Sequence, residues 1–135
     1  MKHPRAARWD DTMRELFDEI DDWLEERYGQ RYPLHPNRPA RGRTASREMD
    51  GLFNVGADFT AGFGSRHGRG YVVSMRLATL ESVPTAVREE IESDVVRLLG
   101  EKLPQKFPGR RLEVRRDGTL LKIVGDLSLG PASAP

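Results

Sequence analysis

The sequence contains no cysteine among its 135 residues. This absence excludes disulfides, thiolate zinc sites, iron–sulfur clusters and cysteine nucleophiles together, and it fits a reducing compartment. We therefore expect a cytoplasmic protein. The length corresponds to one ordinary domain that can bury a hydrophobic core without cross-links.

Long apolar runs are also missing. The basic N-terminal stretch, MKHPRAARWDD, leads into an acidic segment rather than an apolar one, so we expect neither a signal peptide nor a membrane span. Histidine is scarce, and His3, His35 and His67 stand singly with no second ligand at metal-binding spacing. We expect no metal, no cofactor and no catalytic residue.

Charge is segregated along the chain although its net value is only +1. Nine acidic residues lie between Asp10 and Glu26, where Arg14 is the single basic residue, whereas six arginines and no acid lie from Arg27 to Arg47. Such asymmetry can mark an electrostatic binding surface. It can equally be a solvated helix face beside a solvated loop, and we expect the acidic face to be solvated.

Apolar residues at helical spacing predict an amphipathic helix over residues 1–29 that Gly29 ends. Its buried stripe is expected to contain Trp9, Met13, Leu16, Phe17, Ile20, Leu24 and Tyr28. Residues 30–50 hold three prolines and no sustained apolar period, which predicts a long loop or a mobile linker. Residues 51–130 form the rest of the domain, and residues 131–135 a disordered tail.

Alternating apolar residues predict strands over 52–63 and 70–79, paired as a hairpin. A helix follows, with Ser82 as its expected cap and with Pro104 and Pro108 together at its expected end. Asp117-Gly118 is a strong turn signal, and a two-residue turn there would place Val114 opposite Leu121, with positive φ at Gly118. The fold class is therefore α+β, in the order α-β-β-α-β-β, with antiparallel hairpins forming a four-stranded sheet and the helices packed on one face.

Residues 62–70, GFGSRHGRG, are the richest in glycine and positive charge. A dinucleotide-binding fingerprint requires a strand-to-helix turn and a glycine where His67 stands, and no Gly-Lys-Ser/Thr sequence of a Walker loop is present. The sequence therefore matches neither of these phosphate-binding motifs. The stretch is expected to be the loop of the first hairpin.

Two functions remain from the sequence. The first is a non-catalytic protein-interaction or assembly module, most simply a homodimer, because a four-stranded sheet leaves two open edges. The alternative is weak, sequence-indifferent binding of nucleic acid or phosphate, although Tyr32 is the only aromatic residue in these loops that is available for base stacking. Convergence of the basic side chains on one surface would favour the alternative, and dispersal would favour protein contact; the candidates are Arg38, Arg41, Arg43, Arg47, Arg66, His67 and Arg69.

Overall fold

The computed structural model describes residues 4–45, 49–60, 69–117 and 120–125. In these residues the chain forms two helices and four strands, which confirms the predicted α+β class and element order. The elements are α1 (Pro4–Tyr28), β1 (Phe53–Thr60), β2 (Gly70–Leu77), α2 (Thr85–Lys106), β3 (Leu112–Asp117) and β4 (Leu120–Gly125).

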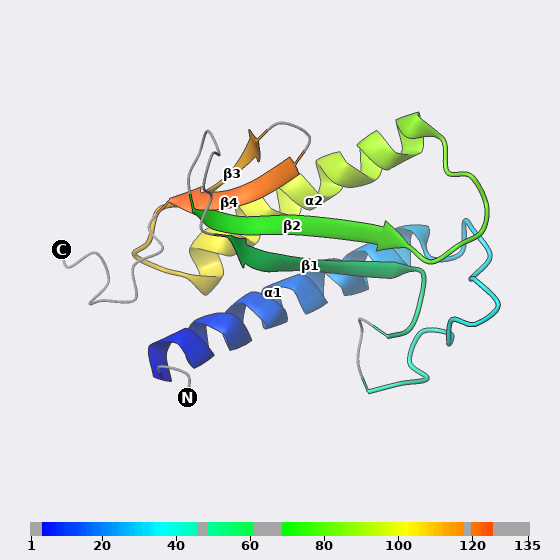
Figure 1. Cartoon of the computed structure of the whole chain (residues 1–135), viewed down its shortest axis with the longest axis horizontal. Coiled ribbons are helices and arrows are strands. Elements are labelled where there is room, and N and C mark those ends of the chain that lie inside the picture. Colours follow the sequence, from blue (N-terminus) through cyan, green and yellow to red (C-terminus); the bar gives the residue numbers. More distant parts are fainter. Residues whose placement is uncertain (1–3, 46–48, 61–68, 118–119, 126–135) are drawn as a thin grey trace.

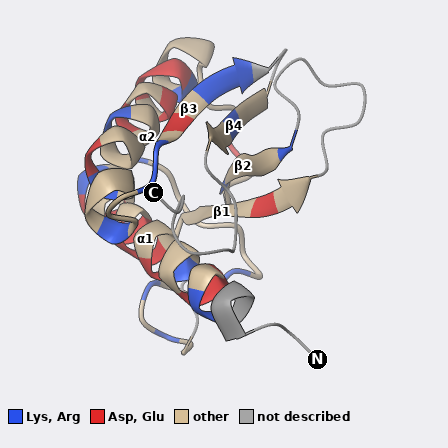
Figure 2. Ribbon diagram, turned by 90° about the vertical axis from the view of Figure 1, so that its left-hand side faces the viewer, with Lys and Arg blue, Asp and Glu red and all other residues tan. Residues whose placement is uncertain are grey.

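The four strands form one antiparallel sheet in the order β1-β2-β4-β3, so β1 and β3 are its edges. Both helices lie on the same side of this sheet (Figures 1 and 2). α1 contacts β1, α2 contacts β3, and the two helices pack against each other. α1 lies below β1 in Figure 1, so the helix projects past this edge of the sheet.

The core lies between the helices and the sheet. All seven residues of the predicted α1 stripe are buried, and Leu16, Ile20 and Leu24 have no exposed surface. They meet the helix-facing side chains of β1, among them Phe53 and Val55. Burial of each such side chain contributes roughly 1.5–3 kcal/mol, which makes this interface the main source of stability for α1.

The acidic face of α1 is not simply solvated, contrary to expectation. Glu19 Oε1 accepts from Lys102 Nζ at 2.9 Å, and Glu15 Oε1 accepts from Lys106 Nζ at 2.8 Å. These ion pairs join α1 to α2. At the other end of the helix pair, the Tyr28 hydroxyl contacts the carboxylates of Glu90, at 2.9 Å, and Asp94 on α2. The two helices are therefore antiparallel neighbours.

The expected cap of α2 was wrong, and its expected end was only partly right. The helix begins at Thr85 after Pro84, with no side-chain cap, so Ser82 does not cap it. It passes through Pro104 and ends at Lys106, before Pro108, because a proline near the end removes only one hydrogen bond of the last turns and the sequence beyond it still packs Phe107 into the core.

The register of the final hairpin was also wrong, by two residues. Asp117 pairs with Leu120, and Val114 faces Ile123 rather than Leu121. Because side chains alternate with a period of two, both registers keep the apolar residues on one face, and the pattern alone could not separate them. Gly118, for which positive φ was predicted, lies outside the described residues. No helix in the described ranges is long and apolar enough to cross a membrane.

Candidate functional site

The long loop between α1 and β1 is tied to α1 by Arg41. Its guanidinium forms ion pairs with Asp21, at 2.8 Å from Nη1 to Oδ1, and with the neighbouring Asp22. The same Nη1 lies 3.5 Å from Asp50 Oδ1. Asp50 in turn accepts hydrogen bonds from the backbone N–H and the hydroxyl of Thr44, both at 3.0 Å. These contacts hold Arg41, Thr44 and Asp50 of the loop against the C-terminal half of α1.

Asp21 and Asp50 are both buried but have opposite pKa shifts. Burial raises the pKa of Asp21 to about 7; the charge of Arg41 opposes this rise, and the nearby carboxylate of Glu25 adds to it. Burial also acts to raise the pKa of Asp50, but the hydrogen bonds from Thr44 and the charge of Arg41 outweigh it and hold this pKa below its usual range. Asp50 therefore stays ionised at lower pH than Asp21, whose carboxyl loses its proton only near neutral pH.

At the start of β1, the side chains of Glu25 and Arg38 form hydrogen bonds with the backbone. The Glu25 carboxylate accepts from Leu52 N at 2.7 Å and from Phe53 N at 3.1 Å. Arg38 Nη2 donates to Phe53 O at 3.3 Å, and Arg38 Nε donates to Gly51 O at 2.9 Å. Both backbone groups of Phe53 are thereby satisfied within the chain.

The remaining part of the β1 edge is open. Ala78 N donates to Leu52 O at 2.7 Å, and these residues are opposite each other in the β1–β2 register. Hydrogen-bonded pairs alternate in an antiparallel ladder, so every second residue after Leu52 turns its N–H and C=O toward β2. The residues between them, Phe53 and then Val55, Ala57 and Phe59, direct these groups away from the sheet. We call the last three the outward residues; of the described segments, none pairs with this side of β1.

A groove of about 290 Å³ runs between α1 and this edge. Its apolar wall contains Met13 and Phe17 from α1 and Tyr71 from β2, together with all three outward residues. Ala57 has only a methyl side chain, which leaves the groove open at the middle of β1. Phe59 is 58% exposed and makes an edge-on contact with the Tyr71 ring at 5.7 Å.

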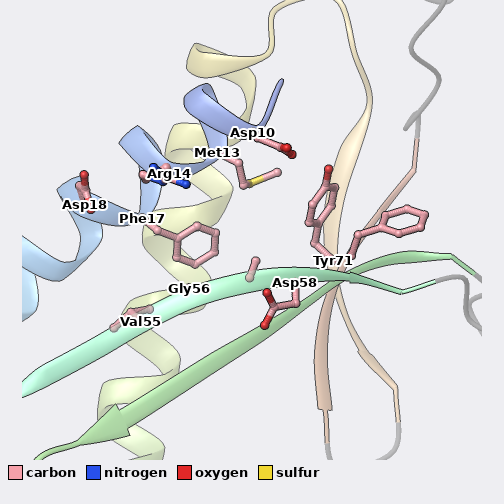
Figure 3. A pocket seen from close by; sticks show the side chains of 11 residues that line it. Asp10, Met13, Arg14, Phe17, Asp18, Val55, Gly56, Asp58 and Tyr71 are labelled. Atoms are coloured by element: carbon pink, nitrogen blue, oxygen red, sulfur yellow. The ribbon is translucent and has the colours of Figure 1, made fainter. Parts of the chain in front are cut away.

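The rim of the groove is charged. Asp10, Arg14 and Asp18 follow one another along α1 at helical spacing, and Asp58 lines the groove from β1 with its carboxylate directed away from α1 (Figure 3). Arg14 and Asp58 are exposed, whereas Asp10 and Asp18 are half-buried. Burial raises the pKa of the Tyr71 phenol, and the charge of Asp10 adds to this rise. The groove thus combines an apolar floor, a strand edge that no described strand covers and charged residues at its rim.

Of the arginines proposed from the sequence, the four that the structure describes do not meet on one surface. Arg38 and Arg41 bind within the protein as described, and Arg43 is exposed in the same loop. Arg69 is exposed next to Gly70, which pairs with Thr60 at the opposite end of the β1–β2 hairpin (Figure 1). Arg47, Arg66 and His67 lie outside the described residues. Among the described residues, no group of three or more His, Cys, Asp and Glu side chains is arranged to hold a metal ion.

The outward residues and the groove were missed at the sequence level. Met13, Phe17 and Tyr71 were correctly placed on apolar faces, but the pattern does not say that the strand beside them is an edge. The adjacent Gly56 and Ala57 in an otherwise regular strand were the available signal. Small residues in a strand interior often mark a place where another backbone approaches.

Comparison with known proteins places these elements in a family. Residues 4–125, which span α1 to β4, match a protein family described as "Uncharacterised protein". An uncharacterized protein of Borreliella burgdorferi is 40% identical over 107 residues, which cover 79% of this chain and 84% of that protein. No solved structure matches the chain. The chain therefore belongs to this family of uncharacterised proteins.

Proposed function

We propose that the protein is a non-catalytic interaction module that binds an extended segment of a partner protein as an added strand along β1. One observation carries the proposal: the outward residues present backbone donors and acceptors directly beside the groove, and no described strand pairs with them. In strand addition, main-chain hydrogen bonds supply affinity, and pockets for alternate side chains supply specificity. We place this activity in the cytoplasm, which the absence of cysteine supports.

The sequence of β1 favours pairing. Edge strands are commonly protected from other chains by lysine, proline or a bulge, and FNVGADFT has no lysine or proline and pairs with β2 without a break. The backbone N–H and C=O of Phe53 are already hydrogen-bonded to Glu25 and Arg38, so an added strand cannot pair there. It would therefore pair with the outward residues and end before Phe53.

A second copy of the chain is a poor occupant of this edge. The groove lining carries three carboxylates and one guanidinium, and a twofold pairing of β1 with itself would double this negative charge. A segment of another protein that carries basic residues complements the groove instead. The homodimer expected from the open edges is thus the competing outcome of the test.

Phosphate or nucleic-acid binding has less support. Arg38 and Arg41 already direct donors to backbone carbonyls and carboxylates of the chain itself. Arg43 and Arg69 lie at opposite ends of the first hairpin. Dispersal of the described arginines favours protein contact over a phosphate-tracking surface.

The test compares Ala57→Pro with Ala57→Ser. Proline removes the N–H of an outward residue and leaves the β1–β2 ladder intact, whereas serine keeps the N–H at nearly the same size. Linear segments are selected from a random peptide library on the wild-type protein, and their affinities for both variants are measured. We expect binding to survive Ala57→Ser and to fall at least about tenfold with Ala57→Pro.

A second measurement covers the case in which Ala57→Pro fails to fold. N-methyl groups are placed on alternate amides of a selected segment, in the two possible sets. Strand addition requires that one set abolishes binding to the wild-type protein and the other does not. Equal effects of both sets, or selected segments that bind Ala57→Pro as tightly as wild type, would refute strand addition. A dimer that Ala57→Pro dissociates would identify a second copy as the occupant instead.

A further inference from the structure

The last part of β1 carries two exposed side chains that point to opposite faces of the sheet. Phe59, one of the outward residues, is 58% exposed and lies on the helix side. Asp58, the residue before it, is also exposed, and its carboxylate is directed away from α1 (Figure 3). We call these two residues the strand-end pair. Because strand side chains alternate between faces, the pair offers an apolar group on one face and a negative charge on the other.

The negative charge of the strand-end pair is not neutralised by the described part of the chain. Among the described residues, the Asp58 carboxylate has no hydrogen-bond or ion-pair partner. The residue opposite it on β2 is the apolar Val72. Gly56 precedes it on the same face, and a Cβ at that position would meet no other described atom within 4 Å. The carboxylate therefore has both free charge and space beside it for a side chain of an added strand.

The apolar member of the pair is anchored to the core through other aromatic rings. Phe59 makes an edge-on contact with Tyr71, and Tyr71 stacks on the buried Trp9 with 6.5 Å between ring centroids. Phe59 is thus the exposed end of a row of three rings. Directly opposite residues on neighbouring strands have Cβ atoms about 5 Å apart, and aromatic rings pack favourably at such positions. An aromatic residue opposite Phe59 would extend the row by one ring.

Given strand addition at β1, we propose that the partner segment carries an aromatic residue opposite Phe59 and, at the adjacent position, a basic residue opposite Asp58. Adjacent residues of a strand point to opposite faces, so each of the two contacts one member of the strand-end pair. The two positions are adjacent in both chain directions. Only their order depends on whether the added strand is parallel or antiparallel to β1.

The strand-end pair also selects against other occupants of the edge. A charge on an edge strand discourages indiscriminate pairing with other chains, and the Asp58 carboxylate would repel an acidic residue placed opposite it. The same charge attracts a basic residue, so it discriminates between segments. A second copy of β1 does not meet this requirement, because FNVGADFT contains no basic residue.

The test uses three capped peptides on a threonine background, which favours the extended conformation. The first, Ac-Thr-Thr-Thr-Phe-Lys-Thr-Thr-NH2, carries the proposed pair. The second has glutamate in place of lysine, and the third has alanine in place of phenylalanine. Titrations followed by NMR measure their affinities for wild type. We expect the first peptide to bind at least about threefold more tightly than either of the others.

Variants of the strand-end pair should change these preferences. Asp58→Lys should prefer the second peptide to the first. Glu89→Lys, at an exposed position on α2, makes the same change of net charge away from β1 and should keep the wild-type preference. Phe59→Ala should lose most of the preference for the first peptide over the third, because the ring that the phenylalanine contacts is gone.

The outcomes separate this inference from the proposed function. Equal affinity of wild type for all three peptides, or an unchanged preference in Asp58→Lys, would overturn the aromatic and basic pair while leaving strand addition in place. If Asp58→Lys fails to fold, the segments selected from the random library decide, because selected segments without an adjacent aromatic and basic residue would overturn the pair. Saturable binding of none of the three peptides, together with no segment selected from the library, would overturn both.

Discussion

Replacing Asp21 by asparagine should stabilise the protein at and above neutral pH and change little under acidic conditions. The pKa of Asp21 is raised from 3.8 to about 7 in the folded protein, chiefly because the side chain is buried. The folded state therefore binds more protons than the unfolded state between about pH 4 and pH 7, and stability falls as the pH rises through this window. Asparagine resembles the protonated carboxyl and does not titrate.

The size of the effect follows from the shift. About three pKa units correspond to at most about 4 kcal/mol, reached above pH 7, where the wild-type carboxylate is ionised in both states. Urea unfolding at a series of pH values, followed by the fluorescence of Trp9 and Trp23, measures the difference between variant and wild type. We expect it to be close to zero near pH 4 and to grow until about pH 7.

Asp22→Asn is the matched control. Asp22 binds the same arginine, but its side chain is 49% exposed. Loss of its charge should therefore destabilise the protein by less than about 1 kcal/mol, with no growing gain in stability toward neutral pH. Parallel stability profiles of Asp21→Asn and wild type across pH 4–8 would refute the assignment of Asp21 as the buried titratable partner of Arg41.

Three further predictions concern two single contacts and the oligomeric state. Gly51→Ala should lower the free energy of unfolding by about 1 kcal/mol or more, because φ is +76° and a Cβ would lie 2.9 Å from the Glu25 carboxylate; an unchanged urea midpoint would contradict this. Tyr28→Phe should cost about 1 kcal/mol or more, and a double-mutant cycle with Asp94→Asn should show coupling between the two residues. Light scattering at tens of micromolar, roughly where weak dimers form, should give the monomer mass, and a dimer mass would favour the second copy as occupant.

The helices and strands could be predicted from the sequence because burial imposes a periodic pattern of apolar residues. Leu16, Ile20 and Leu24 repeat at helical spacing, and Val55 and Ala57 alternate with polar residues at strand spacing. The register of the final hairpin could not be predicted, because a shift of two residues leaves every side chain on the same face of the sheet. The path of α2 through Pro104 depended on the packing of the residues beyond it.

The candidate site could not be predicted for a different reason. The strand order β1-β2-β4-β3 arises from long-range pairing, so the sequence did not show that β1 is an edge. The roles of Arg38 and Glu25 likewise depend on where the loop returns to α1. A sequence shows that an arginine is present, but only the fold shows which acceptors lie within its reach.

The most direct test of the account is site-resolved amide hydrogen exchange along β1, with and without a segment selected from the random library. In the free protein, we expect the amides of the outward residues to exchange faster than those that face β2, namely Asn54, Gly56 and Asp58. We expect the bound segment to slow the outward amides selectively. Equal protection of both sets in the free protein would show that this edge is already covered. Outward amides unchanged in the saturated complex would contradict strand addition at β1.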